Sequence, residues 1–161
     1  MTAATYQPAA RRIHATGRVT FSPEISDPLG LFTPEGERVW AERWDPRYPD
    51  AGSRQPGPGS VFIVSHDDTS TTWVITDHVP GRSIRYVRFR PDMQAGMLSV
   101  TITEPGVATV TYDITALSEQ GLLESKHLES HVQQMLDGWS RMIEAAMAGP
   151  PRVTERPASS E

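Results

Sequence analysis

The sequence predicts an α+β domain: a curved antiparallel sheet of about six to seven strands wraps around one long C-terminal helix, with a cavity between them. Three observations predict this fold. Apolar and polar residues alternate through much of the middle of the chain, as in strands with one solvated face. The pairs Pro80-Gly81 and Pro105-Gly106 separate these segments as tight turns do. A final apolar stripe then recurs with the 3.6-residue period of a helix.

The chain of 161 residues has the length of one ordinary domain. We expect the domain to occupy residues 13–148. Residues 1–12 and 149–161 contain too little apolar side chain to offset the entropy of ordering them, so they are expected to be disordered tails.

Composition excludes several classes of function. The chain has no cysteine, which excludes disulfides, thiolate nucleophiles and thiolate-held metals. The net charge of −5 argues against a nucleic-acid binder, which usually has a basic surface. No apolar run approaches the ~20 residues of a membrane span, and no signal peptide is expected. We therefore expect a cytoplasmic protein, a monomer or homodimer, that needs no cofactor.

The first strand is predicted over 13–21, where apolar or small residues occupy alternate positions. Ser22-Pro23-Glu24 has the pattern of a helix start, with Ser as N-cap and Pro in the first turn. A second strand is predicted over 37–44. The Pro- and Gly-rich segment 46–58 is predicted to be a loop, which either closes over a site or lacks regular structure.

A meander of strands follows, and a helix ends the domain. The strands are predicted over 61–64, 72–79, 83–90, 97–103 and 107–115. The helix is predicted over 122–148, because Ser118 provides a polar lead-in and Gly149-Pro150 a stop. Its apolar stripe consists of Leu128, Val132, Met135, Leu136, Trp139, Met142, Ile143 and Ala146. This stripe must be buried against the apolar face of the sheet.

Short segments along the chain carry a family resemblance. They are SPE at 22–24, FTPEGER at 32–38, WDP at 44–46, TWVI at 72–75, IRYVR at 84–88 and TALS at 115–118. In this order, over about 13–147, they resemble an uncharacterised bacterial branch of the START-like (SRPBCC) superfamily, which includes polyketide cyclase/dehydrase and lipid-transfer type proteins. The resemblance implies a helix-grip fold whose cavity holds a small, largely apolar molecule. It does not imply one activity.

The predicted strand over 37–44 places Arg38, Trp40, Glu42 and Trp44 on one face. If that face is buried, the two indoles desolvate Glu42 and raise its pKa, which is how a general acid arises. In the alternative, the face meets solvent, the Trp side chains pack under the Pro-rich loop and Glu42 pairs with Arg38.

Arg88 shares a strand face with Tyr86. If this face points inward, Arg88 is a fixed cation that can hold a carboxylate, phenolate or enolate oxygen. In the other register Val87 and Phe89 point inward and Arg88 is solvated. Both remain open.

Aromatic side chains supply most of the remaining candidates. Tyr112 shares a face with apolar neighbours, so its hydroxyl is expected to need a partner inside. The candidate ligand-binding residues are Trp40, Trp73, Tyr86, Tyr112, His131, Met135 and Trp139. The same side chains could instead be ordinary core and wall residues.

His127 and His131 lie one turn apart on the predicted final helix and could share a metal ion. The alternative places His131 at the edge of the cavity and His127 on the surface. The spacing alone is a weak signal, so no metal is expected.

These observations lead first to a binding protein for a small hydrophobic or aromatic molecule. An alternative is a polyketide cyclase/dehydrase-like enzyme, in which Tyr112, Arg88 and Glu42 polarise a carbonyl and move a proton. A second alternative is an accessory or chaperone-partner protein that uses the outer sheet face. Titratable groups converging in the cavity would favour the enzyme, and an all-apolar wall would favour the binding protein.

Overall fold

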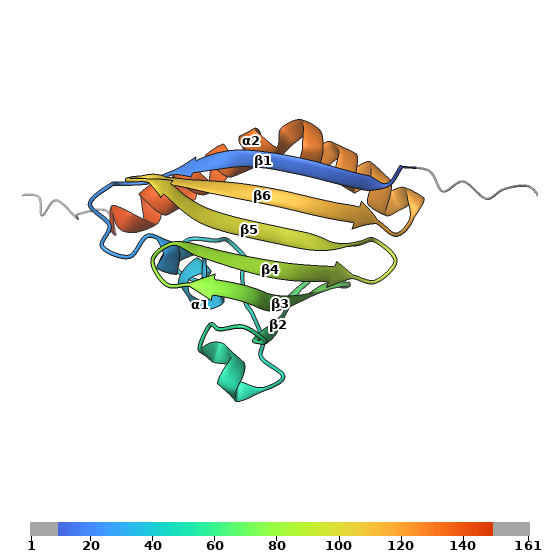
Figure 1. The fold of residues 1–161 in the computed structure, drawn as a ribbon, viewed down its shortest axis with the longest axis horizontal. Coiled ribbons are helices and arrows are strands. Elements are labelled where there is room, and N and C mark those ends of the chain that lie inside the picture. Colours follow the sequence, from blue (N-terminus) through green and yellow to red (C-terminus); the bar gives the residue numbers. More distant parts are fainter. Residues whose placement is uncertain (1–9, 150–161) are drawn as a thin grey trace, which may run out of the picture.

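The structure is a computed structural model that describes residues 10–149. It has the predicted α+β architecture (Figure 1). The strands are β1 Arg12–Thr20, β2 Val61–His66, β3 Thr69–Val79, β4 Ser83–Arg90, β5 Gln94–Glu104 and β6 Val107–Ala116. They form one antiparallel sheet of six strands in the order β1-β6-β5-β4-β3-β2. Helix α2, Glu119–Met147, follows. Most of both predicted tails lies outside the described residues, and Arg12 already belongs to β1.

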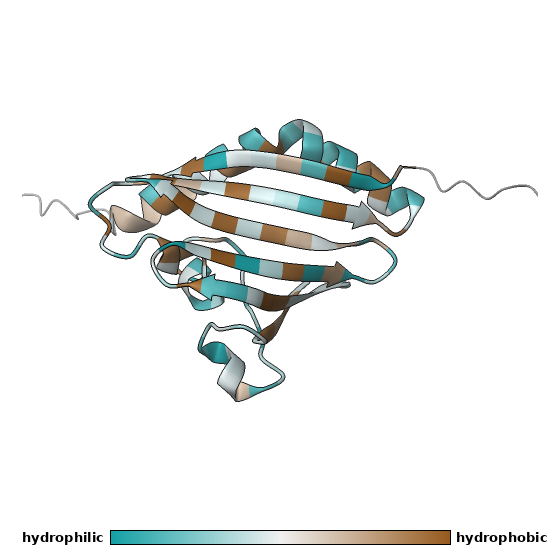
Figure 2. Cartoon of the chain, in the orientation of Figure 1, coloured by the Kyte–Doolittle hydropathy of each residue, from teal (hydrophilic) through white to brown (hydrophobic). Residues whose placement is uncertain are grey.

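The meander forms because tight turns join consecutive strands. Gly81 and Gly106 adopt φ of 75° and 78° in two of these turns, a conformation that costs glycine little. Asp67 and Asp92 adopt φ of 51° and 59° in the other two, where short polar side chains are tolerated best. Along each strand apolar residues alternate with polar ones (Figure 2).

Helix α2 lies against the β1 side of the sheet (Figure 1). The Ser118 side chain caps its start by accepting a hydrogen bond from the Gly121 amide at 3.0 Å. Leu136 is fully buried at the centre of the stripe. A Cβ at Gly17 of β1 would lie 2.6 Å from Leu136 Cδ1, so glycine lets the helix approach closely. Among the described residues, no helix is long and apolar enough to cross a membrane.

The free edge of β1 is bonded to α2. The Gln133 side chain accepts a hydrogen bond from the Arg18 amide at 2.9 Å and donates one to the Arg18 carbonyl at 3.0 Å. Ser140 Oγ accepts from the Thr20 amide at 3.0 Å. At the opposite edge, Arg47 and Ile63 of β2 exchange backbone hydrogen bonds of 2.9 and 2.8 Å. Some backbone N–H and C=O groups of both edge strands are therefore hydrogen-bonded, by side chains of α2 at β1 and by the backbone of Arg47 at β2.

The segment 21–48, called here the cover segment, differs from the prediction. It contains a 3₁₀ helix, Leu29–Phe32, and a short helix α1, Pro34–Glu37, and no strand forms over 37–44. The helix start predicted at Ser22 is also wrong. The same signature recurs at Thr33-Pro34, where the Thr33 hydroxyl accepts from the Gly36 amide at 3.1 Å.

The cover segment lies over the half of the sheet that α2 leaves open. Phe32 is fully buried there, and the Trp40 ring lies 5.6 Å from the Trp139 ring of α2, centroid to centroid. The Trp40 Nε1 donates to the Leu31 carbonyl at 2.7 Å. The concave face of the sheet therefore has two covers, α2 and the cover segment, which meet at these two indoles.

Two glycines of α2 allow a matched test of packing. A Cβ at Gly121 would lie 1.9 Å from the Met93 carbonyl oxygen, whereas at Gly138 the nearest atom, Arg141 Nη2, is 3.8 Å away. We expect Gly121→Ala to lower the free energy of unfolding by about 1–3 kcal/mol. Gly138→Ala should raise it by about 1 kcal/mol through helix propensity. Urea unfolding measures both, and equal effects would contradict the packing described.

Candidate ligand-binding cavity

A cavity of about 140 Å³ lies between the sheet and its two covers. It is called here the inner cavity, and its lining residues are Glu37, Trp44, Phe62, Trp73, Tyr86, Arg88, Leu98, Tyr112 and Trp139. Its volume is close to that of an engineered core cavity of roughly 150 Å³ that takes up benzene. The inner cavity therefore has room for a small ring system.

Strand register brings the lining side chains together. Tyr86, Leu98 and Tyr112 are direct partners across β4, β5 and β6. Phe62 pairs with Trp73 across β2 and β3, and Trp73 pairs with Arg88 on β4. Because side chains directly opposite one another in a sheet lie on the same face, these two rows form one wall.

Aromatic rings contact one another throughout this wall. The Phe62 and Trp73 rings are stacked, with centroids 5.8 Å apart and an interplanar angle of 3°. Tyr86 meets both edge-on at 5.9 and 5.7 Å. Trp44 of the cover segment meets the same two rings at 6.0 and 6.1 Å. Such offset and edge-to-face pairs stabilise the arrangement beyond the area that they bury.

The structure decides between the two registers of β4: Tyr86 and Arg88 point inward and Phe89 is 42% exposed. The Arg88 guanidinium carbon lies 5.1 Å from the Trp73 ring centroid. Its Nε is buried without a hydrogen bond, and no ion pair in the described part of the chain includes Arg88. Burial lowers the pKa of Arg88, but an arginine remains protonated in proteins. Arg88 is thus a cation in the cavity wall without a counterion.

The two tyrosine hydroxyls differ. Tyr86 donates a hydrogen bond of 2.6 Å to the Phe32 carbonyl, so this hydroxyl ties the sheet to the cover segment. For Tyr112, none of the hydrogen bonds within residues 10–149 involves its hydroxyl. Burial raises the pKa of Tyr112 to about 12, with the Arg88 charge acting in the opposite direction. Tyr112 therefore presents a neutral hydroxyl to the cavity.

Glu37, the last residue of α1, was not among the sequence candidates. Glu37 is half-buried and lines both the inner cavity and the hollow beside Trp40 and Trp139, and burial raises its pKa well above the usual range. The sequence does hold a signal for it. The Thr33-Pro34 cap starts a helix whose first turn carries Glu37, whereas the false strand pattern directs attention to Glu42.

Glu42 itself is exposed, and the predicted sandwich between Trp40 and Trp44 does not form. Arg38 pairs with Glu35 and, at 2.6 Å, with Asp45, not with Glu42. The strand alternation that grouped these side chains is absent because residues 38–40 and 42–43 form turns.

Three other candidates lie outside the inner cavity. Trp40 is buried beside it and lines a neighbouring hollow, which shares Glu37, Trp44 and Trp139 with the inner cavity. His131 and Met135 line an open apolar hollow on α2. The His127 and His131 rings are stacked with centroids 4.1 Å apart, and the described residues contain no group of three His, Asp or Glu suited to a metal.

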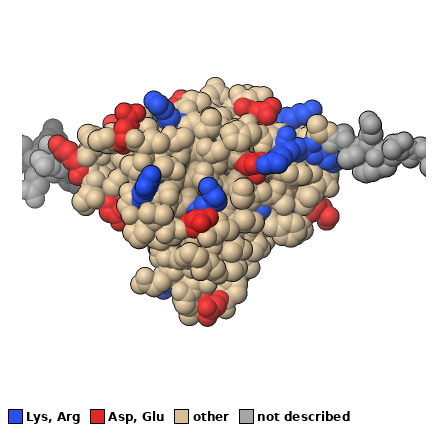
Figure 3. Space-filling view, in the orientation of Figure 1, with Lys and Arg blue, Asp and Glu red and all other residues tan. Residues whose placement is uncertain are grey.

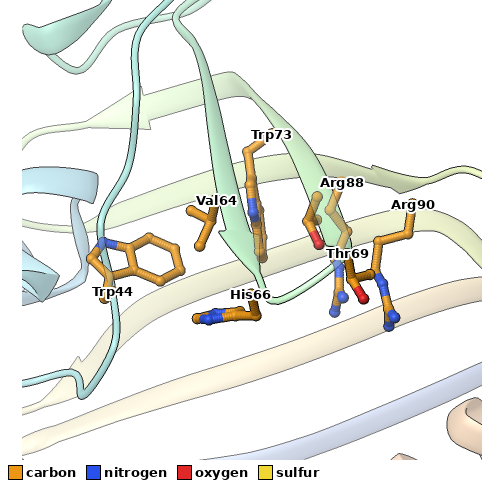
Figure 4. Close-up of a pocket in the computed structure, with 8 residues that line it drawn as sticks. Trp44, Val64, His66, Thr69, Trp73, Arg88 and Arg90 are labelled. Carbon is orange, nitrogen blue, oxygen red and sulfur yellow. The ribbon is translucent and has the colours of Figure 1, made fainter.

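An outer recess of about 280 Å³ adjoins the inner cavity (Figure 4). The two hollows share the side chains of Trp44, Trp73 and Arg88. In Figure 4 the Arg88 and Arg90 guanidinium groups point the same way, with Trp73 beside Arg88. Arg90 is neutralised by Glu124 of α2 at 2.7 Å. The recess is therefore the more polar of the two hollows, and its lining also includes His66.

The loop 46–58 does not line either hollow. It contains a 3₁₀ helix, Ala51–Arg54, and Arg54 Nε donates to Glu35 at 2.6 Å. Ser53 is buried and its hydroxyl accepts from the Val61 amide at 3.1 Å. The loop is thus attached to the outside of β2 and α1. On the sheet face shown in Figure 3, charges of both signs are scattered.

No protein-family model matches the chain, and no curated protein matches it in sequence. Solved structures match its fold. DynU16, from the dynemicin biosynthetic locus, aligns at TM-score 0.55 and 14% identity over 89% of this chain, which spans about half (49%) of DynU16. A protein from Arthrobacter aurescens aligns at 0.54 and 11% over 94% of both chains. Ms6760 from Mycobacterium smegmatis aligns at 0.53 and 16%, over 87% of this chain and 92% of that one.

Because these sequence identities are low, the similarity shows a shared fold and indicates neither a ligand nor an activity for this chain. The inner cavity must be interpreted from its own residues.

The raised pKa of Glu37 predicts a specific pH dependence of the free energy of unfolding. Its pKa is higher in the folded than in the unfolded chain, so folding takes up a proton between the two values. We compare the free energies of unfolding of the wild type and of Glu37→Gln. The wild type is most stable relative to the variant below pH of about 4.3, the pKa of the unfolded chain, and loses this stability as the pH rises through the pKa of the folded chain. The slope cannot exceed about 1.4 kcal/mol per pH unit for one proton.

Urea unfolding between pH 4 and about 8.5 measures this difference. Glu42→Gln, at the exposed carboxyl in the same segment, is the matched control. If the two variants have the same pH profile, the pKa of Glu37 is not raised in the folded chain.

Proposed function

We propose that the chain is a START-like, helix-grip protein that binds a small, planar, largely apolar molecule in the inner cavity. The observation that carries the proposal is a wall of stacked and edge-to-face aromatic rings around about 140 Å³, interrupted by only a few polar groups. Small-molecule sites have this composition, in which apolar walls supply affinity and a few polar atoms fix orientation. The adjoining outer recess is the proposed route to solvent.

Two neighbouring positions on β5 test this proposal. Leu98 lines the inner cavity, and Met97 lies on the opposite face and is 40% exposed. We expect Leu98→Trp to fill the cavity and abolish binding of naphthalene, while Met97→Trp binds as the wild type does. At ligand concentrations near 100 times Kd, binding should raise the free energy of unfolding by about 2.7 kcal/mol.

Thermal unfolding with and without naphthalene measures the effect. Circular dichroism checks that both variants fold. Equal stabilisation of Leu98→Trp and Met97→Trp would place the binding site elsewhere.

The polar groups of the inner cavity support a second candidate, a cyclase/dehydrase-like enzyme. Glu37, Tyr112 and Arg88 all line the same cavity, and the charges of Arg88 and Glu37 both act on the pKa of Tyr112. Arg88 and Tyr112 can polarise a ketone carbonyl while the neutral Glu37 carboxyl gives its proton to the leaving hydroxyl. The carboxylate that results can take the proton from the carbon next to the carbonyl, so the products are an enone and water and Glu37 is protonated again. Ring closure with loss of water needs this chemistry.

The two cavity tyrosines offer a matched pair for the enzyme candidate. With a β-hydroxy ketone as probe, Tyr112→Phe and Arg88→Ala should each remove turnover. Tyr86→Phe should keep turnover while losing about 1–3 kcal/mol of stability, because it leaves the Phe32 carbonyl unpaired. The elimination is followed by ultraviolet absorbance of the enone. A Tyr112→Phe rate equal to that of the wild type would remove this candidate.

A further inference from the structure

We propose that the ligand is an aromatic acid, whose carboxylate pairs with Arg88 while its ring lies in the inner cavity. The inference rests on the proposed binding function and names the class of its ligand. It follows from three features of the wall shared by the inner cavity and the outer recess.

The first feature is the missing counterion of Arg88. Arg88 is half-buried, with its Nε fully buried and its side chain lining the open outer recess, and a partly buried charge is costly when no opposite charge lies beside it. The nearby carboxylate of Glu124 already pairs with Arg90 at 2.7 Å. Glu37 carries a carboxyl that burial keeps protonated to higher pH, so it is a poor source of negative charge. The side chains that line this wall therefore leave the Arg88 charge for another group to neutralise.

The second feature is a set of unused donors. Arg88 Nε and Trp73 Nε1 are both buried and without a hydrogen-bond partner in the described structure. These two atoms are shielded from solvent, so the groups that can reach a ligand are the terminal guanidinium nitrogens of Arg88, which make no hydrogen bond within residues 10–149 and belong to a side chain that lines both hollows. A carboxylate is suited to these nitrogens because it accepts several hydrogen bonds and matches the planar fork of a guanidinium.

The third feature is the position of Arg88 relative to the rings. Its guanidinium lies over Trp73, at 5.1 Å from the ring centroid, and lines both hollows. A ring held among Phe62, Trp73 and Tyr86 can therefore direct a carboxylate toward the shared wall. A neutral aromatic compound would fill the same space but leave the Arg88 charge uncompensated.

Isothermal titration calorimetry at pH 7 with three probes of one ring system tests the inference. The probes are 2-naphthoate, its neutral analogue 2-naphthamide, and naphthalene. We expect the wild type to bind 2-naphthoate about tenfold to a hundredfold more tightly than 2-naphthamide, the range for hydrogen bonds to charged groups. Arg88→Met should lose this preference while still binding naphthalene.

Arg85→Met is the matched control. Arg85 lies on the same strand, carries the same charge and is exposed, with Asp77 at 3.7 Å. We expect this variant to keep the preference for the acid. If Arg88→Met does not fold, Arg88→Lys retains the charge without the planar fork, and should weaken 2-naphthoate but not naphthalene binding.

Equal affinities of the wild type for the acid and the amide would overturn the inference and leave the binding function intact. Displacement of 2-naphthoate by an equal concentration of inorganic phosphate would also overturn it, since the site would then recognise anions without the ring. Absence of binding by all three aromatic probes would remove the proposed function, and with it this inference.

Discussion

The close approach of α2 to β1 is the constraint on which the rest of the structure depends. Gly17 leaves space for Leu136, so the helix lies on the β1 side and cannot also cover β2, β3 and β4. The cover segment must bury the remaining apolar face. The two covers meet at Trp40 and Trp139, and the inner cavity lies next to this junction. A cavity is thus a consequence of covering one curved sheet with two separate pieces.

The polar groups of the cavity lower the stability of the fold. Arg88 is half-buried and has no ion-pair partner within residues 10–149, and burial raises the pKa of the half-buried Glu37, so each of these polar groups is partly removed from water. The surrounding rings and the Tyr86 hydrogen bond hold this arrangement in place. Polar groups that lower stability are commonly retained at functional sites. Arg88 contributes to both candidate functions, and Glu37 contributes to the enzyme candidate alone.

Regular periodicity was predictable from the sequence, and irregular segments were not. In strands β2–β6 and helix α2, the apolar positions recur over enough residues for the period of a strand or a helix to be recognised. The sequence of β4 alone could not show whether Arg88 points into the cavity or toward solvent, because Tyr86 on its own face and Val87 on the other face can both be buried. The pairing of Tyr86 with Leu98 on β5 shows that the face of Tyr86 and Arg88 points inward. Residues 37–44 alternate like a strand, yet successive turns bury Trp40. Because this segment was wrongly predicted to be a strand, Glu42 was taken as the candidate acidic residue of the cavity and Glu37 was not.

The hydrogen bonds along β1 bear on how copies of the chain can associate. Exposed strand edges promote aggregation, because an incoming strand extends the sheet. Along the C-terminal half of β1, Gln133 and Ser140 occupy the backbone groups of Arg18 and Thr20, and the Arg47 pairing occupies part of the β2 edge. Sheet extension at these places requires breaking existing bonds. Extension of the sheet is therefore hindered at Arg18, Thr20 and Ile63.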